Sequence, residues 1–140
     1  ISRIGLYQNK AKAVKGLARI LLDQFNGKVP RTIEELIMLP GVGRKTASCV
    51  LGYAFHIPAV AVDTHVFRIS HRLGWAKGKT PEVVEEELKK LFPPKDWVEI
   101  NRMGVKFGRT ICIPGRPRCW QCPVRDLCPY QPKTPDPTKK

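Results

Sequence analysis

The chain has 140 residues, of which 42% are hydrophobic, enough for one ordinary domain or two small ones. Its 25 Lys and Arg against 12 Asp and Glu give a formal net charge of +13, which favours a polyanionic partner, above all nucleic acid. No stretch approaches the roughly 20 apolar residues of a membrane span, none forms a long basic amphipathic helix, and no signal peptide is visible, so a membrane partner is disfavoured.

The first predicted helix runs from about Gln8 to Phe25, where apolar residues recur at helical spacing. These residues are Ala11, Val14, Leu17, Ala18, Leu21 and Leu22. We expect the helix to end at Asn26 and Gly27, because Gly27 suits the left-handed conformation found after many helices. The lysines on its other side should form a solvated face, part of which could lie near DNA.

The stretch Leu39 to Thr46, which reads LPGVGRKT, is expected to join two further helices. The first starts near Ile33, because Thr32 and Glu35 have the spacing of a capping box. Pro40 stops it, since proline cannot continue a helix.

Gly41 and Gly43 lie in the turn, and the second helix is predicted from Arg44 to about Phe55. Glycine tolerates positive φ and has no Cβ, so the backbone can turn tightly and approach a ligand closely. The N–H groups of the next helical turn have no helical partner and favour an anion. The pattern predicts a helix–hairpin–helix that holds one backbone phosphate without reading a base. A corner used only for packing is the alternative.

Lys45 lies in the first turn of this second helix, where the helix dipole disfavours a cation. Partial burial, the helix terminus and basic neighbours would each favour a neutral amine. A neutral amine can attack an electrophilic carbon and form a Schiff base. The alternative is one more surface lysine.

Residues His56 to Val62 are predicted to form an extended loop, because a helix cannot run through Pro58. Asp63 follows and is well placed to cap a helix from Thr64 to Leu73, with Gly74 as its stop. From the residues alone, Asp63 could serve as that cap and nothing more.

Two more helices are predicted before the cysteines. One starts at Thr80 with Pro81 in its first position, carries several Glu, and is expected to face away from DNA. The other runs from Asp96 to about Thr110, where Gly104 and Gly108 suggest close packing.

The five cysteines divide into one and four. Cys49 lies in the middle of a predicted apolar helix and is expected to be core packing. The other four fit a metal site in a reducing compartment better than disulfides. Zinc and iron–sulfur clusters both use four thiolates, although zinc sites commonly have two Cys-x2-Cys pairs and this chain has one. The order of the four is Cys112-x6-Cys119-x2-Cys122-x5-Cys128.

Three motifs in this order resemble the endonuclease III family of DNA glycosylases, in the helix–hairpin–helix–Gly/Pro–Asp superfamily. They are LPGVGRKTA, the segment Ala61-Val62-Asp63-Thr64-His65, and the four-cysteine spacing. The resemblance covers Ile4 to Tyr130. The family usually has further helices before the point where Ile1 aligns, and the first residue is not Met, so we expect an N-terminally incomplete chain that lacks one wall of the pocket.

The resemblance implies an all-α helix–hairpin–helix DNA glycosylase fold with a C-terminal iron–sulfur loop. Residues 1–111 would be the helical domain, with the hairpin motif at 33–55 and the Gly/Pro–Asp loop at 56–63. Residues 112–128 would hold a [4Fe–4S] cluster through Cys112, Cys119, Cys122 and Cys128. The Pro- and Lys-rich residues 129–140 are expected to form a disordered basic tail.

The implied function is base excision repair, in which oxidised pyrimidines are removed and abasic sites are cleaved. Lys45 would attack the sugar, and Asp63 would shuttle protons and stabilise positive charge there, while His65 packs or hydrogen-bonds nearby. The partner would be double-stranded DNA with damaged bases or abasic sites, bound by a monomer in the cytoplasm and nucleoid. The expected DNA contacts are Leu39, Gly41, Val42, Gly43, Arg44, Arg116 and Arg118.

Two other functions remain open. An adenine glycosylase of the same superfamily also carries the cluster, but those enzymes generally have a hydroxyl residue where this chain has Lys45. A non-catalytic DNA-binding module would keep the hairpin and the cluster and lose the chemistry. For Arg116 and Arg118, ordinary surface charge is the alternative to phosphate contact.

Overall fold

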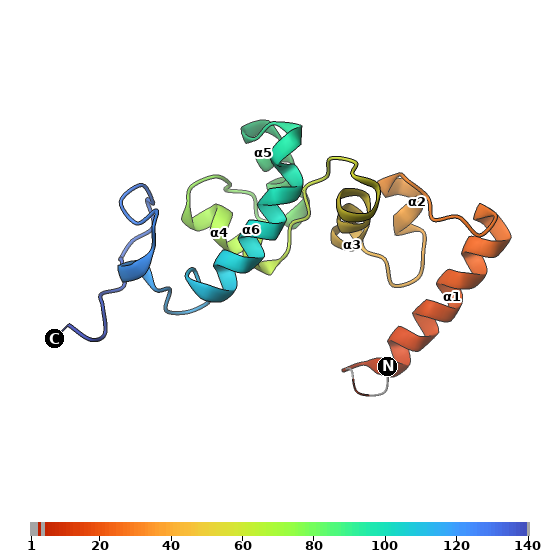
Figure 1. The fold of residues 1–140 in the computed structure, drawn as a ribbon, viewed down its shortest axis with the longest axis horizontal. Helices are drawn as coiled ribbons and strands as arrows, with labels where there is room; N and C mark the ends of the chain where they lie inside the picture. The colour runs from red at the N-terminus through yellow and green to blue at the C-terminus, as the bar shows by residue number, and fades with distance from the viewer. Residues whose placement is uncertain (1–2, 4, 140) are drawn as a thin grey trace. The chain divides into compact units, whose positions relative to one another are not determined.

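Every regular element among the described residues, 3 and 5–139, is a helix in the computed structural model of the chain (Figure 1). The all-α prediction is therefore confirmed. Ile1, Ser2, Ile4 and Lys140 lie outside the described residues, so the first residues of the expected domain 1–111 and the last residue of the expected tail are not covered. The chain divides into two compact units, Ile1–Ile57 and Pro58–Lys140.

The first unit begins with α1, Tyr7–Phe25, close to its predicted bounds. It ends as predicted, with left-handed φ values at Asn26 (52°) and Gly27 (74°), and the Gly27 N–H donates to the Leu21 carbonyl at 2.8 Å. None of the α1 residues, all of which the structure describes, is buried. Some of its apolar side chains, such as Val14 and Leu22, are therefore exposed to solvent.

The helix α2, Ile33–Ile37, confirms the predicted cap. The Thr32 hydroxyl oxygen accepts a hydrogen bond from the Glu35 N–H at 3.3 Å, and the hydroxyl donates to Glu35 Oε2 at 2.8 Å. Leu36 and Leu39, which precede the turn, are both buried. The hairpin is thus fixed by a local cap on one side and by two core leucines on the other.

The next helix departs from the prediction in its second half. α3, Arg44–Cys49, passes directly into a π-helix, η1, Val50–Ala54, instead of continuing to Phe55 as one α-helix. The Ile57 N–H closes the segment by donating to the Leu51 carbonyl at 3.0 Å. Nothing in the side-chain pattern distinguishes the two helix types at this point. The predicted burial of this segment is confirmed at Ala47 and Leu51.

The second unit is built from α4 (Thr64–Arg72), α5 (Pro81–Leu91) and α6 (Trp97–Thr110), with short 3-10 turns η2 (Pro94–Asp96) and η3 (Cys119–Gln121). Its core joins the extended loop before α4 to the facing sides of α4 and α5. The buried members are Val60, Val62, Val66, Ala76, Val84 and Leu88.

The helices α4 and α6 lie in close contact because two glycines of α6 leave room. A Cβ on Gly104 would lie 2.9 Å from a methyl carbon of Val66, and one on Gly108 would lie 2.7 Å from His65 Nδ1. The close packing expected at these glycines is thus confirmed.

The acidic helix α5 is less solvated than its composition suggests. Glu85 is buried and forms an ion pair with Lys89 at 2.5 Å. Glu87 Oε2 accepts hydrogen bonds from the backbone N–H groups of Lys77 (3.0 Å) and Gly78 (2.9 Å). Glu87 therefore holds the basic loop before α5 in place.

Acid should release this loop. The N–H groups of Gly78 and Lys77 lower the pKa of Glu87 below its ordinary value of 4.5. The Glu87 carboxylate therefore stabilises the fold fully above pH 4.5, and this stabilisation is lost as the pH falls through the lowered pKa. We expect the hydrogen-exchange protection factor of the Gly78 amide to fall over that acid range. In Glu87→Gln the protection factor of the Gly78 amide should already be reduced at neutral pH, whereas in Glu82→Gln it should equal that of wild type. Equal protection in both variants would contradict this role.

Candidate functional site

The hairpin places two exposed glycines and Lys45 at the start of α3. Gly41 has the positive φ expected of it, 76°, and the Val42 N–H donates to the Leu39 carbonyl at 3.0 Å. Gly43 instead is extended, with φ −91°, a conformation open to any residue. A Cβ on Gly43 would have no heavy atom within 4 Å, so its backbone faces open space.

The other hairpin residues differ in exposure. Leu39 is 3% exposed, so its side chain belongs to the core of the first unit. Val42 and Arg44 are half-buried. Lys45 is exposed, so partial burial, one of the factors expected to favour its neutral form, is not supplied by the residues that the structure describes.

Asp63 caps α4 as predicted, and the cap uses one carboxylate oxygen. Its Oδ1 accepts hydrogen bonds from the N–H groups of His65 at 2.9 Å and Val66 at 2.8 Å. The side chain is half-buried at the N-terminus of the helix, where the dipole favours a negative charge. This geometry holds the carboxylate in one place.

His65 is a hydrogen-bond acceptor at one ring nitrogen. Arg68 Nη2 lies 3.1 Å from His65 Nδ1. Because a guanidinium only donates, Nδ1 must accept, and the ring proton is therefore assigned to Nε2. The expectation that His65 hydrogen-bonds is confirmed.

Two arginines of α4, four residues apart, hold the first cysteine of the loop. Arg68 donates to the Cys112 carbonyl from Nε (3.1 Å) and Nη2 (2.9 Å), and to the Gly108 carbonyl at 3.0 Å. Arg72 Nη1 donates to the Ile113 carbonyl at 2.8 Å and lies 3.3 Å from Cys112 Sγ. Neither arginine is among the site residues predicted from the sequence, although their i, i+4 spacing after a capping Asp is a detectable signal.

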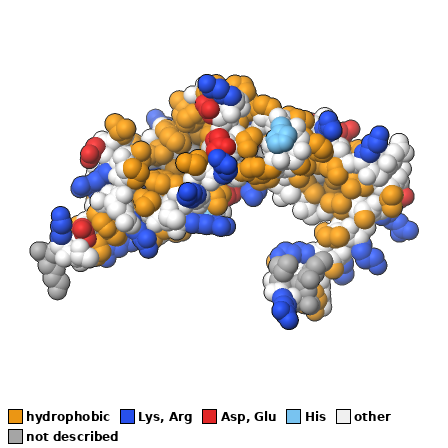
Figure 2. Space-filling model, in the orientation of Figure 1, with side chains coloured by type: hydrophobic (Ala, Val, Ile, Leu, Met, Phe, Trp, Pro, Cys, Tyr) orange, Lys and Arg blue, Asp and Glu red, His pale blue; other side chains and the backbone are white. Residues whose placement is uncertain are grey.

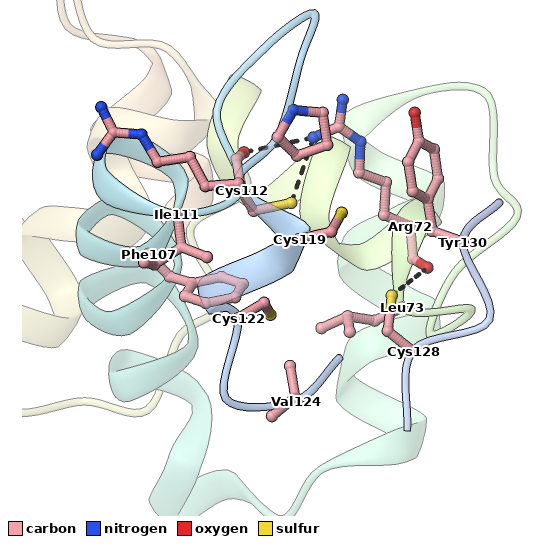
Figure 3. A pocket seen from close by; sticks show the side chains of 12 residues that line it. Arg72, Leu73, Phe107, Ile111, Cys112, Cys119, Cys122, Val124, Cys128 and Tyr130 are labelled. Atoms are coloured by element: carbon pink, nitrogen blue, oxygen red, sulfur yellow. Dashed lines mark hydrogen bonds between the residues drawn. The ribbon is translucent and has the colours of Figure 1, made fainter. Parts of the chain in front are cut away.

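The four loop cysteines line one small cavity with a volume of about 30 Å³ (Figure 3). None of these four cysteines forms a disulfide. Cys128 Sγ lies 3.4 Å from the Arg72 carbonyl oxygen, so α4 contacts both the first and the last cysteine. The walls are completed by apolar side chains that include Phe107, Ile111 and Val124.

The cysteines differ in how readily they ionise. Burial alone would raise the pKa of Cys119, but hydrogen bonds from Thr134 and the charges of Lys133 and Arg72 outweigh it and lower that pKa. Burial raises the pKa of Cys122, and the neighbouring thiols add to this. The surroundings of these two cysteines therefore shift their pKa values in opposite directions.

Part of the expected disordered tail contacts the loop. The Cys119 N–H donates to Thr134 Oγ1 at 3.1 Å, and the Arg72 guanidinium lies 4.8 Å from the centre of the Tyr130 ring. Residues 130–134 therefore differ from a free tail, because hydrogen bonds and ring contact hold them on the cysteine loop. Arg116 and Arg118, in contrast, are both exposed on the loop surface.

Figure 2 shows many basic and few acidic side chains on one face of the molecule. This excess agrees with the net charge of +13. Within residues 3 and 5–139, no helix combines the length and the apolar content that crossing a bilayer requires.

Two family models match the chain. The one for HhH-GPD superfamily base excision DNA repair proteins matches residues 1–94, and the iron–sulfur binding domain of endonuclease III matches residues 112–128. The chain therefore belongs to the HhH-GPD superfamily of base excision DNA repair proteins, and its cysteine loop is an iron–sulfur binding domain. The resemblance drawn from the three motifs is confirmed.

Individual relatives agree. The chain is 51% identical over 130 residues to endonuclease III of Thermotoga maritima, covering 93% of this chain and 61% of the relative. It is 47% identical over 133 residues to endonuclease III of Escherichia coli, covering 95% and 63%. The chain thus spans about three-fifths of the length of these relatives.

Solved structures agree as well. A trapped endonuclease III–DNA covalent intermediate, an estranged-adenine complex, matches with a TM-score of 0.86 at 45% identity, over 91% of this chain and 61% of that one. A thermostable thymine-DNA glycosylase matches with a TM-score of 0.80 at 30% identity, over 91% and 60%. The fold is thus shared with an endonuclease III bound covalently to DNA and with a thymine-DNA glycosylase.

The two hairpin glycines should respond differently to substitution. Gly41→Ala should lower the free energy of unfolding by about 1–3 kcal/mol, because φ is 76° and the new Cβ would lie 2.9 Å from the Cβ of Ala13. Gly43→Ala, in extended backbone with open space, should cost about 0.5 kcal/mol as a weaker helix cap. Urea unfolding of both variants measures the difference, and equal losses would show that the turn does not depend on the left-handed Gly41.

Proposed function

We propose that this chain is part of a base-excision-repair DNA glycosylase with AP lyase activity that removes oxidised pyrimidines from double-stranded DNA. The proposal rests mainly on the position of Lys45. Its amine is exposed in the first turn of α3, close in sequence to Gly43, where a Cβ would have no heavy atom within 4 Å. Membership of a base excision repair family supports it. So does the relative whose solved structure is a covalent intermediate with DNA.

DNA is bound through its phosphates. The N-terminus of α3, where the helix dipole favours an anion, and the glycine backbone before it are proposed to bind one phosphate, and the net charge of +13 supplies sequence-independent attraction. Arg116 and Arg118 are exposed and are proposed as further phosphate contacts from the cysteine loop. The proposed hairpin contacts are Leu39, through its backbone, with Gly41, Val42, Gly43 and Arg44.

Lys45 is the proposed nucleophile on a nucleotide that has been flipped out of the duplex. Its neutral Nζ forms a bond to C1′ while the bond from C1′ to the base breaks, and the base leaves with the electron pair and takes up a proton. Opening of the sugar gives a Schiff base. Removal of a proton from C2′ then expels the 3′ phosphate by β-elimination.

Asp63 is proposed to move protons in these steps and to stabilise positive charge on the sugar. Its fixed carboxylate at the N-terminus of α4 supports this role, because a group held by two hydrogen bonds needs little reorganisation during the reaction. A carboxylate raises the pKa of a nearby amine. The charge of Asp63 would therefore favour the protonated form of Lys45, and Asp63 is not proposed to deprotonate Lys45 by this means.

The iron–sulfur loop is proposed to hold a [4Fe–4S] cluster through Cys112, Cys119, Cys122 and Cys128. Zinc sites commonly use two Cys-x2-Cys pairs, whereas this loop has one such pair with spacings of six and five on its two sides. The match of residues 112–128 to an iron–sulfur binding domain supports a cluster over zinc.

The proposed role of the cluster is structural. Its core of charge 2+ with four thiolates has a net charge of −2, which leaves the chain at about +13 − 2 = +11. When bound, the cluster supplies a four-point cross-link to a loop whose regular structure is one short 3-10 turn. Free thiolates require reducing surroundings, and we propose a monomer that acts in the cytoplasm and nucleoid.

Borohydride trapping tests the nucleophile. Reduction of the Schiff base should join the chain covalently to a duplex with an abasic site, and Lys45→Gln should lower the yield at least 100-fold, because an amide is not a nucleophile. Lys79→Gln, which removes another exposed lysine, should trap as wild type. Gel electrophoresis of the adduct measures the yield.

Two results would refute parts of this mechanism. Trapping that survives Lys45→Gln would remove Lys45 from the reaction. A wild-type chain that binds the duplex but never traps would leave a DNA-binding module without the chemistry.

A further inference from the structure

We infer that residues Tyr130 to Thr134 form a strap that closes the iron–sulfur loop, and that Thr134 is the positioning residue that sets the backbone around Cys119. The strap lies beyond the last cysteine and outside the segment, residues 112–128, that matches the iron–sulfur binding domain. It extends the unit that holds the cluster from Cys128 to Thr134. This inference rests on the proposed ligation of the cluster by the four cysteines.

The Thr134 hydroxyl joins two backbone groups on either side of Arg118. It accepts a hydrogen bond from the Cys119 N–H at 3.1 Å and donates its own proton to the Pro117 carbonyl. These partners are 15 and 17 residues away in the chain, so the bonds are tertiary contacts and not a local turn. Pro117 and Cys119 are both buried, where an unpaired N–H or carbonyl is costly.

Two further contacts join the strap to the fourth cysteine and to α4. The Lys133 ammonium donates to the Cys128 carbonyl. The Tyr130 ring lies under the Arg72 guanidinium, 4.8 Å from its central carbon, and both side chains line the cavity of the four cysteines. The strap is therefore bonded to the fourth cysteine through Lys133 and to the second cysteine through Thr134.

The Thr134 hydroxyl therefore holds the backbone of the cysteine loop at Pro117 and Cys119. The loop from Ile113 to Pro117 has no helix, and the Arg118 N–H is held by the Ile111 carbonyl at 2.9 Å. The Thr134 hydroxyl adds two hydrogen bonds from a more distant part of the chain, one to Pro117 and one to Cys119. Loss of this hydroxyl should let the second cysteine move and should open the cavity to solvent.

Thr134→Val tests the strap, because valine keeps the shape and the β-branch and removes the hydroxyl. Thr138→Val is the matched control, since the Thr138 hydroxyl bonds to Asp136 within the tail at 2.7 Å. Thr134→Ser restores the hydroxyl. The protein is the full chain purified with its cluster, and the readouts are hydrogen exchange at the Cys119 amide and loss of the absorbance near 400 nm in excess iron chelator.

We expect Thr134→Val to accelerate both exchange and cluster loss roughly five- to a hundredfold, the combined factor for the two hydrogen bonds that it removes. Thr138→Val and Thr134→Ser should match wild type, and circular dichroism should show intact helices in all of them. The strap is refuted if exchange at Cys119 in Thr134→Val is no faster than in Thr138→Val. It is also refuted if serine fails to restore the wild-type rates, since side-chain volume would then explain the effect.

The same experiment separates this inference from the proposed cluster. A wild-type protein without absorbance near 400 nm would contradict the [4Fe–4S] proposal. Exchange at the Cys119 amide would still decide whether Thr134 holds the loop.

Discussion

The second unit depends on the contact between Arg68 of α4 and the end of α6. The Arg68 guanidinium bonds the carbonyls of Gly108 and Cys112, so one side chain ties the last turn of α6 and the first cysteine to α4. This contact is possible because Gly104 and Gly108 leave no Cβ between the helices. Burial lowers the pKa of Arg68, but a guanidinium stays protonated and remains a donor at any physiological pH.

The helix α4 thereby positions both the proposed catalytic carboxylate and the iron–sulfur loop. The N-terminus of α4 fixes the Asp63 carboxylate through the His65 and Val66 N–H groups. One and two turns further along, Arg68 and Arg72 hold the iron–sulfur loop. A cluster bound there would stiffen α4 as well as the loop, since Cys112 and Cys128 both contact this helix. The structural role proposed for the cluster follows from this arrangement, without a change in its oxidation state.

Helix caps and the close packing at Gly104 and Gly108 were predictable from the sequence, whereas the π-helix η1 and the distant side-chain hydrogen bonds were not. The caps at Thr32 and Asp63 join residues at most three positions apart, and the left-handed Gly27 needs only its own conformational freedom, so short patterns revealed them. The motifs of the hairpin and the cysteines likewise sufficed to indicate the family from the sequence alone. Thr134, however, bonds residues 15 and 17 positions away, and the Pro- and Lys-rich composition around it predicted disorder instead. Composition describes how a segment behaves alone and says nothing of a partner that folding brings to it.

The contact between α4 and the iron–sulfur loop is tested most directly by the iron content of Arg68→Gln. Purified beside wild type, this variant is expected to keep its helical circular dichroism but to hold several-fold less iron per chain, because Cys112 is no longer fastened to α4. Arg102→Gln, which removes an exposed arginine of α6 that pairs with Glu99, should bind as much iron as wild type. Equal iron content in Arg68→Gln and Arg102→Gln would show that the loop holds its cluster without this contact, and would contradict the dependence of the second unit on Arg68.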